Sequence, residues 1–323
     1  MKKIALLAVA TAGIAIFALS LGAVQVGNIW SSIFALDFSS TATGDQIIWQ
    51  IRAPRIIGAL LIGACLGIAG ALAQGSTNNP LADPAFLGTT AGASLGVIAG
   101  VLTGLVDVAS VGAIICAAIG AMAATALTFS LARSAFQLII IGIALSATLS
   151  AMAGIAISIA ERPEIRSITF WSLGSLALLT WSELLPLVVI AILGLLAASR
   201  IASGVDLLSL GDPAVRYIGR DPQRIRLYAF MVFSILVAVS VSTVGTISFL
   251  ALAAPHIARI IVGPGHRRLL IASAVIGASI LLIADTAART VAPPQDLPIG
   301  LLIALIAAPV LILVLKKGRL QWR

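Results

Sequence analysis

Charged residues are scarce in this chain. Only 10% of its 323 residues are Asp, Glu, Lys or Arg, whereas 60% are hydrophobic, and the mean hydropathy is +1.14. A soluble domain carries about 25% charged residues, so the composition excludes a water-soluble globular protein. Apolar runs of roughly 18 or more residues indicate membrane-spanning helices, and such runs recur along the whole length. The sequence therefore predicts an integral membrane protein.

Residues that hold metals or form disulfides are also rare. Cys65 and Cys116 lie inside apolar runs, and no carboxylate stands at ligand spacing from His256 or His266, the only histidines. We therefore expect neither a disulfide nor a metal site. The chain has no GxxxxGKS or GxxxxGKT phosphate loop, so it is not expected to bind ATP in the usual way. No catalytic centre and no cofactor of its own are predicted.

The apolar runs predict an all-α fold, with about ten transmembrane helices in a single domain that spans residues 1–323. The first run also resembles a signal peptide, with a basic start and an apolar stretch. We favour a retained first span, because it fits the other spans better, although processing of residues 1–22 stays open. The predicted spans are 4–22, 56–76, 85–104, 109–131, 137–160, 182–199, 227–244, 248–262, 269–288 and 299–315.

Basic residues orient these spans. An even number of spans places both termini on one side, and an excess of Lys and Arg marks the cytoplasmic side. With the N-terminus inside, the outer side holds only Arg52, Arg55, Arg162, Arg166 and Arg289. The net charge of +8 thus reflects topology, and no nucleic acid partner is expected. The other fifteen basic residues fall inside: Lys2, Lys3, Arg133, Arg200, Arg216, Arg220, Arg224, Arg226, Arg259, Arg267, Arg268, Lys316, Lys317, Arg319 and Arg323.

Ionisable residues are almost absent from the predicted spans. Asp285 is the deepest, and Arg289 follows four residues later, where an intrahelical ion pair is expected rather than a proton relay. Intramembrane charges usually mark ion or proton routes. Their absence disfavours the alternative of an ion- or proton-coupled secondary carrier, and a non-transporting scaffold or enzyme has no catalytic constellation to support it. Energy for transport is therefore expected from a partner.

Glycine and proline are present in particular patterns. Gly88, Gly92, Gly96, Gly100 and Gly104 recur at every fourth residue, which predicts close packing of helices within the subunit or, alternatively, a subunit interface. The short span 248–262 contains Pro255, and interrupted spans are typical of transporters with internal repeats. No repeat is evident at residue level, so an inverted repeat is an expectation only.

Two polar segments interrupt the apolar sequence. Residues 78–84, NNPLADP, form a polar turn in which two prolines stop helix propagation and two asparagines can bond exposed backbone groups. Residues 200–226 are much longer than the roughly four to six residues that a chain reversal needs. They contain LLSLGDPAVRYIGRDPQRIR, two predicted short helical stretches with an apolar face, which favours a cytoplasmic docking surface over a solvated loop.

Long stretches of the sequence resemble the two signatures of the FecCD-type permeases. The first is RAPRIIGALLIGACLGIAGALAQGSTNNPLADPAFLGTTAGASLG (52–96). The second comprises GTISFLALAAPHIARIIVGPGHRRLLIASAVIGASILLIADTAAR (245–289) and DLPIGLLIALIAAPV (296–310). The resemblance runs in order from about residue 45 to the C-terminus. That family provides the membrane subunits of type II ABC importers for iron–siderophores, haem and vitamin B12.

The resemblance implies several partners in a bacterial cytoplasmic membrane. They are a second permease subunit, identical or paralogous, an ATP-binding cassette ATPase dimer that holds ATP and Mg, an extracytoplasmic substrate-binding protein, and membrane lipid. Ferric siderophore is the expected cargo, because it is the commonest in the family, with haem and cobalamin next.

The resemblance also assigns roles to residues. Asn79, Pro80 and Leu81 resemble the cytoplasmic gate, with Leu81 as a plug, although a turn without a gating role is the alternative. Pro255 and His256, in the PHIAR stretch, are expected to be structural. Arg52, Arg55 and Arg289 resemble basic residues that meet acidic side chains of the binding protein; the alternative is that they anchor helix ends. ATPase coupling is implied for Leu210, Gly211, Asp212, Val215, Arg216, Ile218 and Gly219.

Overall fold

The computed structural model describes residues 2–22, 24, 43–108, 110–132, 134–160, 168–293 and 295–316. Within these ranges the chain is helical and contains no strand. Six of the basic residues used to orient the spans lie outside them: Arg133, Arg162, Arg166, Lys317, Arg319 and Arg323. The elements are α1 (Lys2–Ser20), α3 (Thr43–Gln46), η1 (Ile47–Arg52), α4 (Ala53–Thr77), η2 (Pro84–Leu87), α5 (Thr89–Leu102), α6 (Val111–Leu131), α7 (Ala135–Ser158), α9 (Trp181–Leu208), α10 (Asp212–Tyr217), α11 (Pro222–Val244), α12 (Leu250–Val262), α13 (His266–Ala288) and α14 (Ile299–Lys316).

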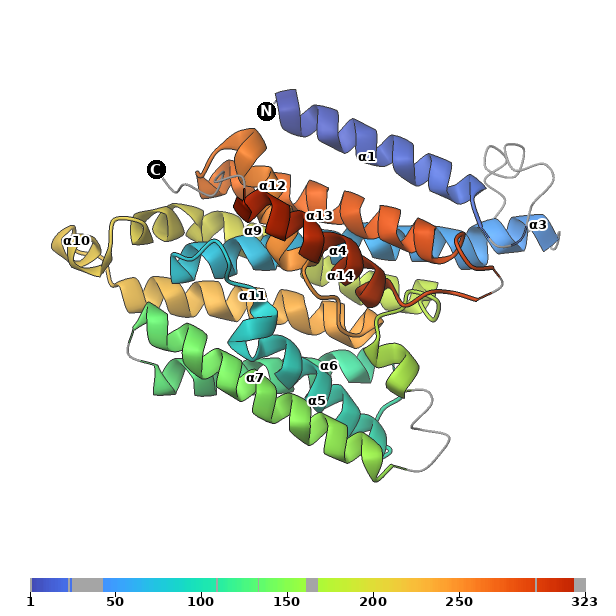
Figure 1. Cartoon of the computed structure of the whole chain (residues 1–323), viewed down its shortest axis with the longest axis horizontal. Helices are drawn as coiled ribbons and strands as arrows, with labels where there is room; N and C mark the ends of the chain where they lie inside the picture. The colour runs from blue at the N-terminus through green and yellow to red at the C-terminus, as the bar shows by residue number, and fades with distance from the viewer. Residues whose placement is uncertain are drawn as a thin grey trace.

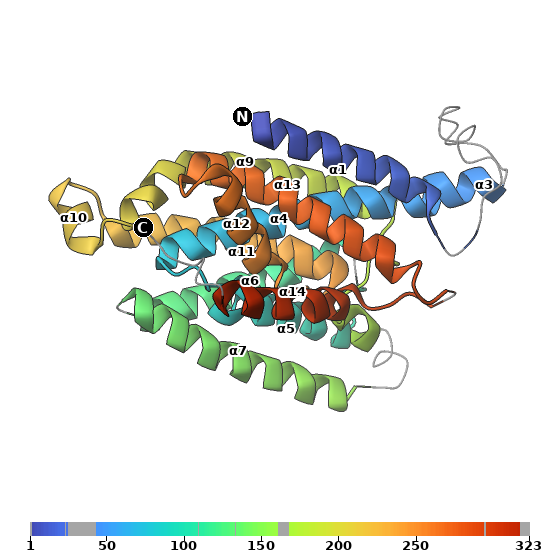
Figure 2. The same ribbon diagram turned by 45° about the horizontal axis from the view of Figure 1, so that its top comes forward.

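Most of the long helices run roughly along one axis around a central helix, α4 (Figure 1). Nearly all side chains of α4 are buried, and it packs against α13, α11, α9 and α12. Helices α1 and α7 lie at opposite edges of the bundle, as Figures 1 and 2 both show. Many side chains of these edge helices are exposed, which suits contact with lipid or another subunit.

Several helix ends meet at one end of the bundle. The Lys3 Nζ donates to the Ile261 carbonyl at 3.2 Å, and the backbone N–H of His266 donates to the Asp206 carboxylate at 3.0 Å. The start of α1, the end of α12, the start of α13 and the end of α9 therefore lie together. Helix α10 projects at this end, and α3 lies at the opposite one (Figure 1). These are called the α10 end and the α3 end below.

Each predicted span contains a helix of the structure. Seven helical stretches among the described residues are long and apolar enough to cross a membrane, whereas α5 and α12 are apolar but shorter. The prediction of an all-helical membrane protein is confirmed. Ten crossings, the single domain and the cytoplasmic position of both termini stay predictions.

Glycines allow the closest helix contacts. A methyl group on Gly92 would overlap the Gly120 carbonyl oxygen, and one on Gly96 would overlap that of Cys116, so α5 and α6 meet backbone to backbone. The glycine pattern was correctly interpreted as packing within the subunit at these two positions. A second contact of this kind joins Gly63 of α4 to Gly277 of α13, and the sequence analysis missed it.

Two spans differ from their predicted bounds. The helix predicted to begin at residue 56 begins earlier, because α3, η1 and α4 run on without a break. The N–H of Ala53 reaches the Ile48 carbonyl five residues back, so a wide π turn precedes Pro54, which has no N–H to contribute. Helix α9 was predicted to end at residue 199 but continues to Leu208. It thus takes up part of the segment that was predicted to be one long interruption.

Candidate functional site: a cavity and its two ends

The NNPLADP segment forms a turn in which its polar side chains fix the backbone. Asn78 ends α4 in the left-handed conformation (φ 52°), and its N–H bonds the Gln74 and Gly75 carbonyls. The Asn79 side-chain oxygen accepts the Leu81 N–H at 2.9 Å. The Asn79 contact confirms the predicted side-chain bond to the backbone, whereas the contacts of Asn78 are made by its own N–H. The Leu81 side chain is 41% exposed, so it is free to project from the turn.

Asp83 continues this turn into η2. Its carboxylate accepts the Ala85 N–H at 2.8 Å, and Pro84 opens the short helix. The side chain is buried, and burial raises the pKa of the Asp83 carboxyl to about 6, against the effect of that hydrogen bond. Residues 78–84 are called the gate segment below.

A cavity of about 410 Å³ lies directly beyond the gate segment. Ala85 lines it, and the Ser146 hydroxyl of α7 donates to the Ala85 carbonyl at 2.8 Å. Among the described residues, no ionisable side chain lines the cavity, and the polar lining groups are hydroxyls. They come from α5, α7, residue 172 and the stretch before α12: Thr90, Ser94, Ser146, Ser150, Ser172, Thr246 and Ser248.

This lining can contact a large polar solute without holding it tightly. Hydroxyls donate and accept hydrogen bonds, but they carry no charge that would trap an ion. The sequence analysis named none of these residues. Their spacing was the available signal, because Thr90 and Ser94, like Ser146 and Ser150, stand four residues apart on one helix face.

Residues 200–226 were predicted to contain two short helices and to couple to an ATPase. The structure has one short helix there, α10, between the end of α9 and the start of α11. Gly211 (φ 84°) and Gly219 (φ 77°) flank it in the left-handed region that favours glycine, which allows a turn on each side of the helix.

The predicted docking face around α10 was wrong at one residue, Val215. Val215 is completely buried inside the subunit, whereas Leu210 (60%) and Ile218 (52%) are exposed. The most exposed large side chain is Tyr217 (93%), which the sequence analysis did not select. Arg216 is also exposed. The surface available to a partner is therefore Leu210, Arg216, Tyr217 and Ile218.

Arg226 connects α10 to the gate segment. Its Nη1 and Nη2 donate to the two carboxylate oxygens of Asp212 at 2.9 and 2.6 Å, and its Nε donates to the Ser76 carbonyl at 3.1 Å. The hydrogen bonds from Arg226 lower the pKa of Asp212. Ser76 lies in the last turn of α4, two residues before Asn78. One buried guanidinium thus bonds the start of α10 and the base of the gate segment.

A second polar contact ties the neighbouring helix ends. The Nδ1 of His266 lies 2.6 Å from the Asp206 carboxylate, so α13 is bonded to the end of α9. This carboxylate was missed because it stands 60 residues from the histidine in sequence. The described residues hold no group of three or more His, Cys, Asp or Glu side chains suited to a metal ion.

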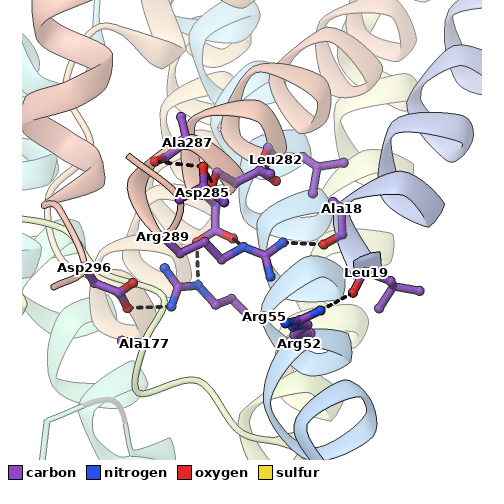
Figure 3. A network of polar contacts seen from close by, with 12 residues as sticks. Ala18, Leu19, Arg52, Arg55, Ala177, Leu282, Asp285, Ala287, Arg289 and Asp296 are labelled. Carbon is purple, nitrogen blue, oxygen red and sulfur yellow. Dashed lines mark hydrogen bonds and ion pairs between the residues drawn. The ribbon is translucent and has the colours of Figure 1, made fainter. Parts of the chain in front are cut away.

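Arginines and aspartates cluster at the α3 end (Figure 3). The Nε of Arg55 donates to Asp285 at 2.6 Å, and its Nη1 donates to Asp296 at 2.7 Å. Arg289 forms the predicted ion pair with Asp285 at 3.6 Å and donates to the Ala18 carbonyl at 2.8 Å. Arg52 donates to the carbonyls of Leu19 and Val24. We call these five charged residues the arginine–aspartate cluster.

The cluster corrects an expectation about exposure. Arg52, Arg55 and Arg289 were predicted on an exposed outer rim, but each is buried, with 4–6% of its surface exposed. The physical reason is that Asp285 and Asp296 neutralise guanidinium groups between α4 and α13, and helix α1 supplies carbonyl acceptors. A direct role in docking stays a prediction.

The helical bundle and its apolar outer faces are those of a polytopic membrane protein. The sequence matches the FecCD transport family over residues 7–317. It is 34% identical to the iron(3+)-hydroxamate import system permease protein FhuB of Bacillus subtilis, over 94% of this chain and 80% of that protein. It is also 34% identical to the hemin transport system permease protein HmuU of Yersinia pestis, over 94% and 93%.

A solved structure agrees with the sequence relatives. A metal-chelate type ABC transporter in an inward-facing conformation superposes with a TM-score of 0.84 at 29% identity, over 98% of both chains. The chain therefore belongs to the FecCD transport family and is a permease of the ABC importer class.

Proposed function

We propose that this protein is the permease subunit of a binding-protein-dependent ABC importer that moves an iron–siderophore complex inward across the bacterial cytoplasmic membrane. The observation that carries the proposal is the cavity beside Ala85, next to the gate segment, whose described lining is uncharged and rich in hydroxyls. Such a lining suits a bulky chelate, whose metal charge is screened by its own ligand. It does not suit a bare cation, which needs charged or carbonyl ligands.

The relatives support the class of cargo. FhuB is named for iron(3+)-hydroxamate and HmuU for hemin, so both imported compounds are large chelates of iron. Ferric siderophore is our first choice, followed by haem and cobalamin.

We propose that the α10 end is cytoplasmic and that the ATPase, which supplies the energy for transport, binds there. An ATPase dimer would bind the exposed surface formed by Leu210, Arg216, Tyr217 and Ile218. A displacement of α10 would reach the gate segment through Asp212, Arg226 and the Ser76 carbonyl. In the closed state Leu81 would block the passage, with Asn79 and Pro80 holding the turn that carries it. Nothing in this sequence of contacts requires a proton or sodium gradient.

The proposal places two further partners around the chain. A second permease subunit, identical or paralogous, would complete the passage, and an extracytoplasmic binding protein would deliver the chelate at the α3 end. The arginine–aspartate cluster lies at that end, and its role in docking is part of the proposal.

Uptake by proteoliposomes tests the function. Vesicles with permease, ATPase and binding protein should accumulate a ferric hydroxamate only when ATP is present on the ATPase side. Parallel assays with haem and cobalamin test the choice of cargo. Uptake by the permease without its ATPase, driven by a proton or sodium gradient, would overturn the proposal in favour of a secondary carrier.

A further inference from the structure

A groove of about 520 Å³ lies between the end of α9 and the start of α11. Three arginines line it from different elements: Arg200 on α9, Arg220 on the turn after α10, and Arg224 on α11. Asp221 also lines the groove and pairs with Arg224 at 3.4 Å. Within the described part of the chain, Arg200 and Arg220 have no such carboxylate partner. The groove therefore keeps a net positive charge that no protein group neutralises.

The length of α9 indicates the depth of this groove in the membrane. Its 28 residues measure about 42 Å, whereas a hydrocarbon core of about 30 Å needs about 20 residues. Trp181 begins the helix with a partly exposed ring, and aromatic side chains of this kind mark the membrane–water boundary. Counting 20 residues from Trp181 ends at Arg200. The groove, with Ser203 and Leu207 beyond Arg200, lies at the level of the lipid headgroups.

Apolar side chains continue the groove toward the membrane centre on both helices. On α9, Leu196 and Leu193 stand four and seven residues before Arg200 and are 48% and 60% exposed. On α11, Tyr228 lines the groove, and Met231 and Ile235 follow on its face, 39% and 41% exposed. This spacing places each set on one helix face. A basic headgroup site thus lies next to an apolar stripe on each of the two helices.

We propose that this groove binds one anionic phospholipid, with its phosphate among Arg200, Arg220 and Arg224 and its acyl chains along the α9 and α11 stripes. Basic pockets between transmembrane helices favour anionic headgroups, and guanidinium forks suit phosphate oxygens. The Ser203 and Tyr228 hydroxyls line the same groove and can donate to the headgroup. Bound there, the lipid would brace the two helices that flank α10.

Native mass spectrometry of the purified permease, titrated with phosphatidylglycerol or phosphatidylcholine, tests the site. We expect one phosphatidylglycerol to bind in preference to phosphatidylcholine. Arg200→Gln/Arg224→Gln should weaken that binding roughly 30-fold, equivalent to about 2 kcal/mol for two basic contacts. Arg267→Gln/Arg268→Gln removes the same charge from exposed positions at the α10 end and should bind as the wild type does. Arg220→Gln, on the turn, gives an independent variant with a smaller loss.

Three results would overturn the proposal. The first is equal affinity of the Arg200/Arg224 variant and the wild type for phosphatidylglycerol. The second is displacement of the lipid by inorganic phosphate at the same concentration, which would make the groove a site for soluble anions. The third is displacement of phosphatidylglycerol from the wild-type permease by the bound ATPase, which would assign the groove to the ATPase.

Discussion

Arg226 and Asp212 face each other through two parallel hydrogen bonds of 2.9 and 2.6 Å, with the arginine buried and the aspartate partly exposed. A paired fork of this kind fixes orientation as well as distance. The Nε of Arg226 also donates to the Ser76 carbonyl. The same guanidinium therefore contacts both α10 and the last turn of α4.

Two single variants, Asp212→Asn and Arg226→Lys, should each uncouple transport from ATP hydrolysis. Lysine keeps the charge but cannot reach both carboxylate oxygens and Ser76 at once. We expect uptake to fall roughly tenfold, equivalent to about 1.4 kcal/mol, while the ATPase still co-purifies and hydrolyses ATP. Arg268→Lys, at an exposed position at the start of α13, is the control. Normal uptake by Asp212→Asn would show that the pair only stabilises the fold.

The partner surface of α10 is tested by two substitutions with opposite expectations. Tyr217→Asp should leave the permease folded but prevent the ATPase from binding, because Tyr217 is 93% exposed. Val215→Asp should instead lower the yield of folded permease, since an unpaired charge at a fully buried position costs several kcal/mol. Size-exclusion profiles and ATPase pull-down separate the two effects. A Tyr217→Asp permease that retains the ATPase would contradict the assignment.

Periodicity and composition predicted the positions of the helices, because a bilayer imposes length and apolarity on every span. They could not predict which apolar residue of α10 is buried. In a six-residue helix, Val215 and Tyr217 are too few to define a face, and contacts with α9 and α11 decide which side chain is buried. The pairing of Arg55 with Asp285 and Asp296 was missed for a related reason. Arg55 and Asp285 lie 230 residues apart, and no local rule pairs them.

The gate segment offers a test of the plug. Leu81→Ala removes a partly exposed apolar side chain from a turn that its backbone bonds hold in place. Loaded proteoliposomes should then lose cargo faster without ATP, and ATP-driven accumulation should fall. Leu105→Ala, at an exposed position after α5, should retain cargo as the wild type does. Equal retention by both variants would show that Leu81 is not the plug.

Asp83 predicts a pH-dependent stability. Burial raises the pKa of this carboxyl from 3.8 to about 6, so the folded state keeps a proton that the unfolded chain has already lost. Stability should therefore fall as the pH rises from about 4 to about 6 and stay lower above that, by at most about 3 kcal/mol. Asp83→Asn keeps an acceptor for the Ala85 N–H and should be more stable near neutral pH. Thermal unfolding of both permeases at a series of pH values measures this, and parallel curves would contradict it.

The arginine–aspartate cluster makes a specific prediction about docking. Arg52, Arg55 and Arg289 are buried, so an acidic side chain of the binding protein can reach Arg55 only by competing with Asp296, whose side chain is 26% exposed. Asp296→Asn removes that competitor and should raise the affinity for the binding protein, with a steeper dependence on salt, because an uncompensated arginine attracts acidic groups over a longer range. Asp107→Asn neutralises an exposed acidic residue in the turn between α5 and α6 and serves as the control for net charge. Asp285→Asn should instead destabilise the fold by about 3–5 kcal/mol, because it leaves two buried guanidinium groups with less compensation. If Asp296→Asn and Asp107→Asn change the affinity equally, Arg55 acts only within the fold, and the docking surface lies elsewhere at the α3 end.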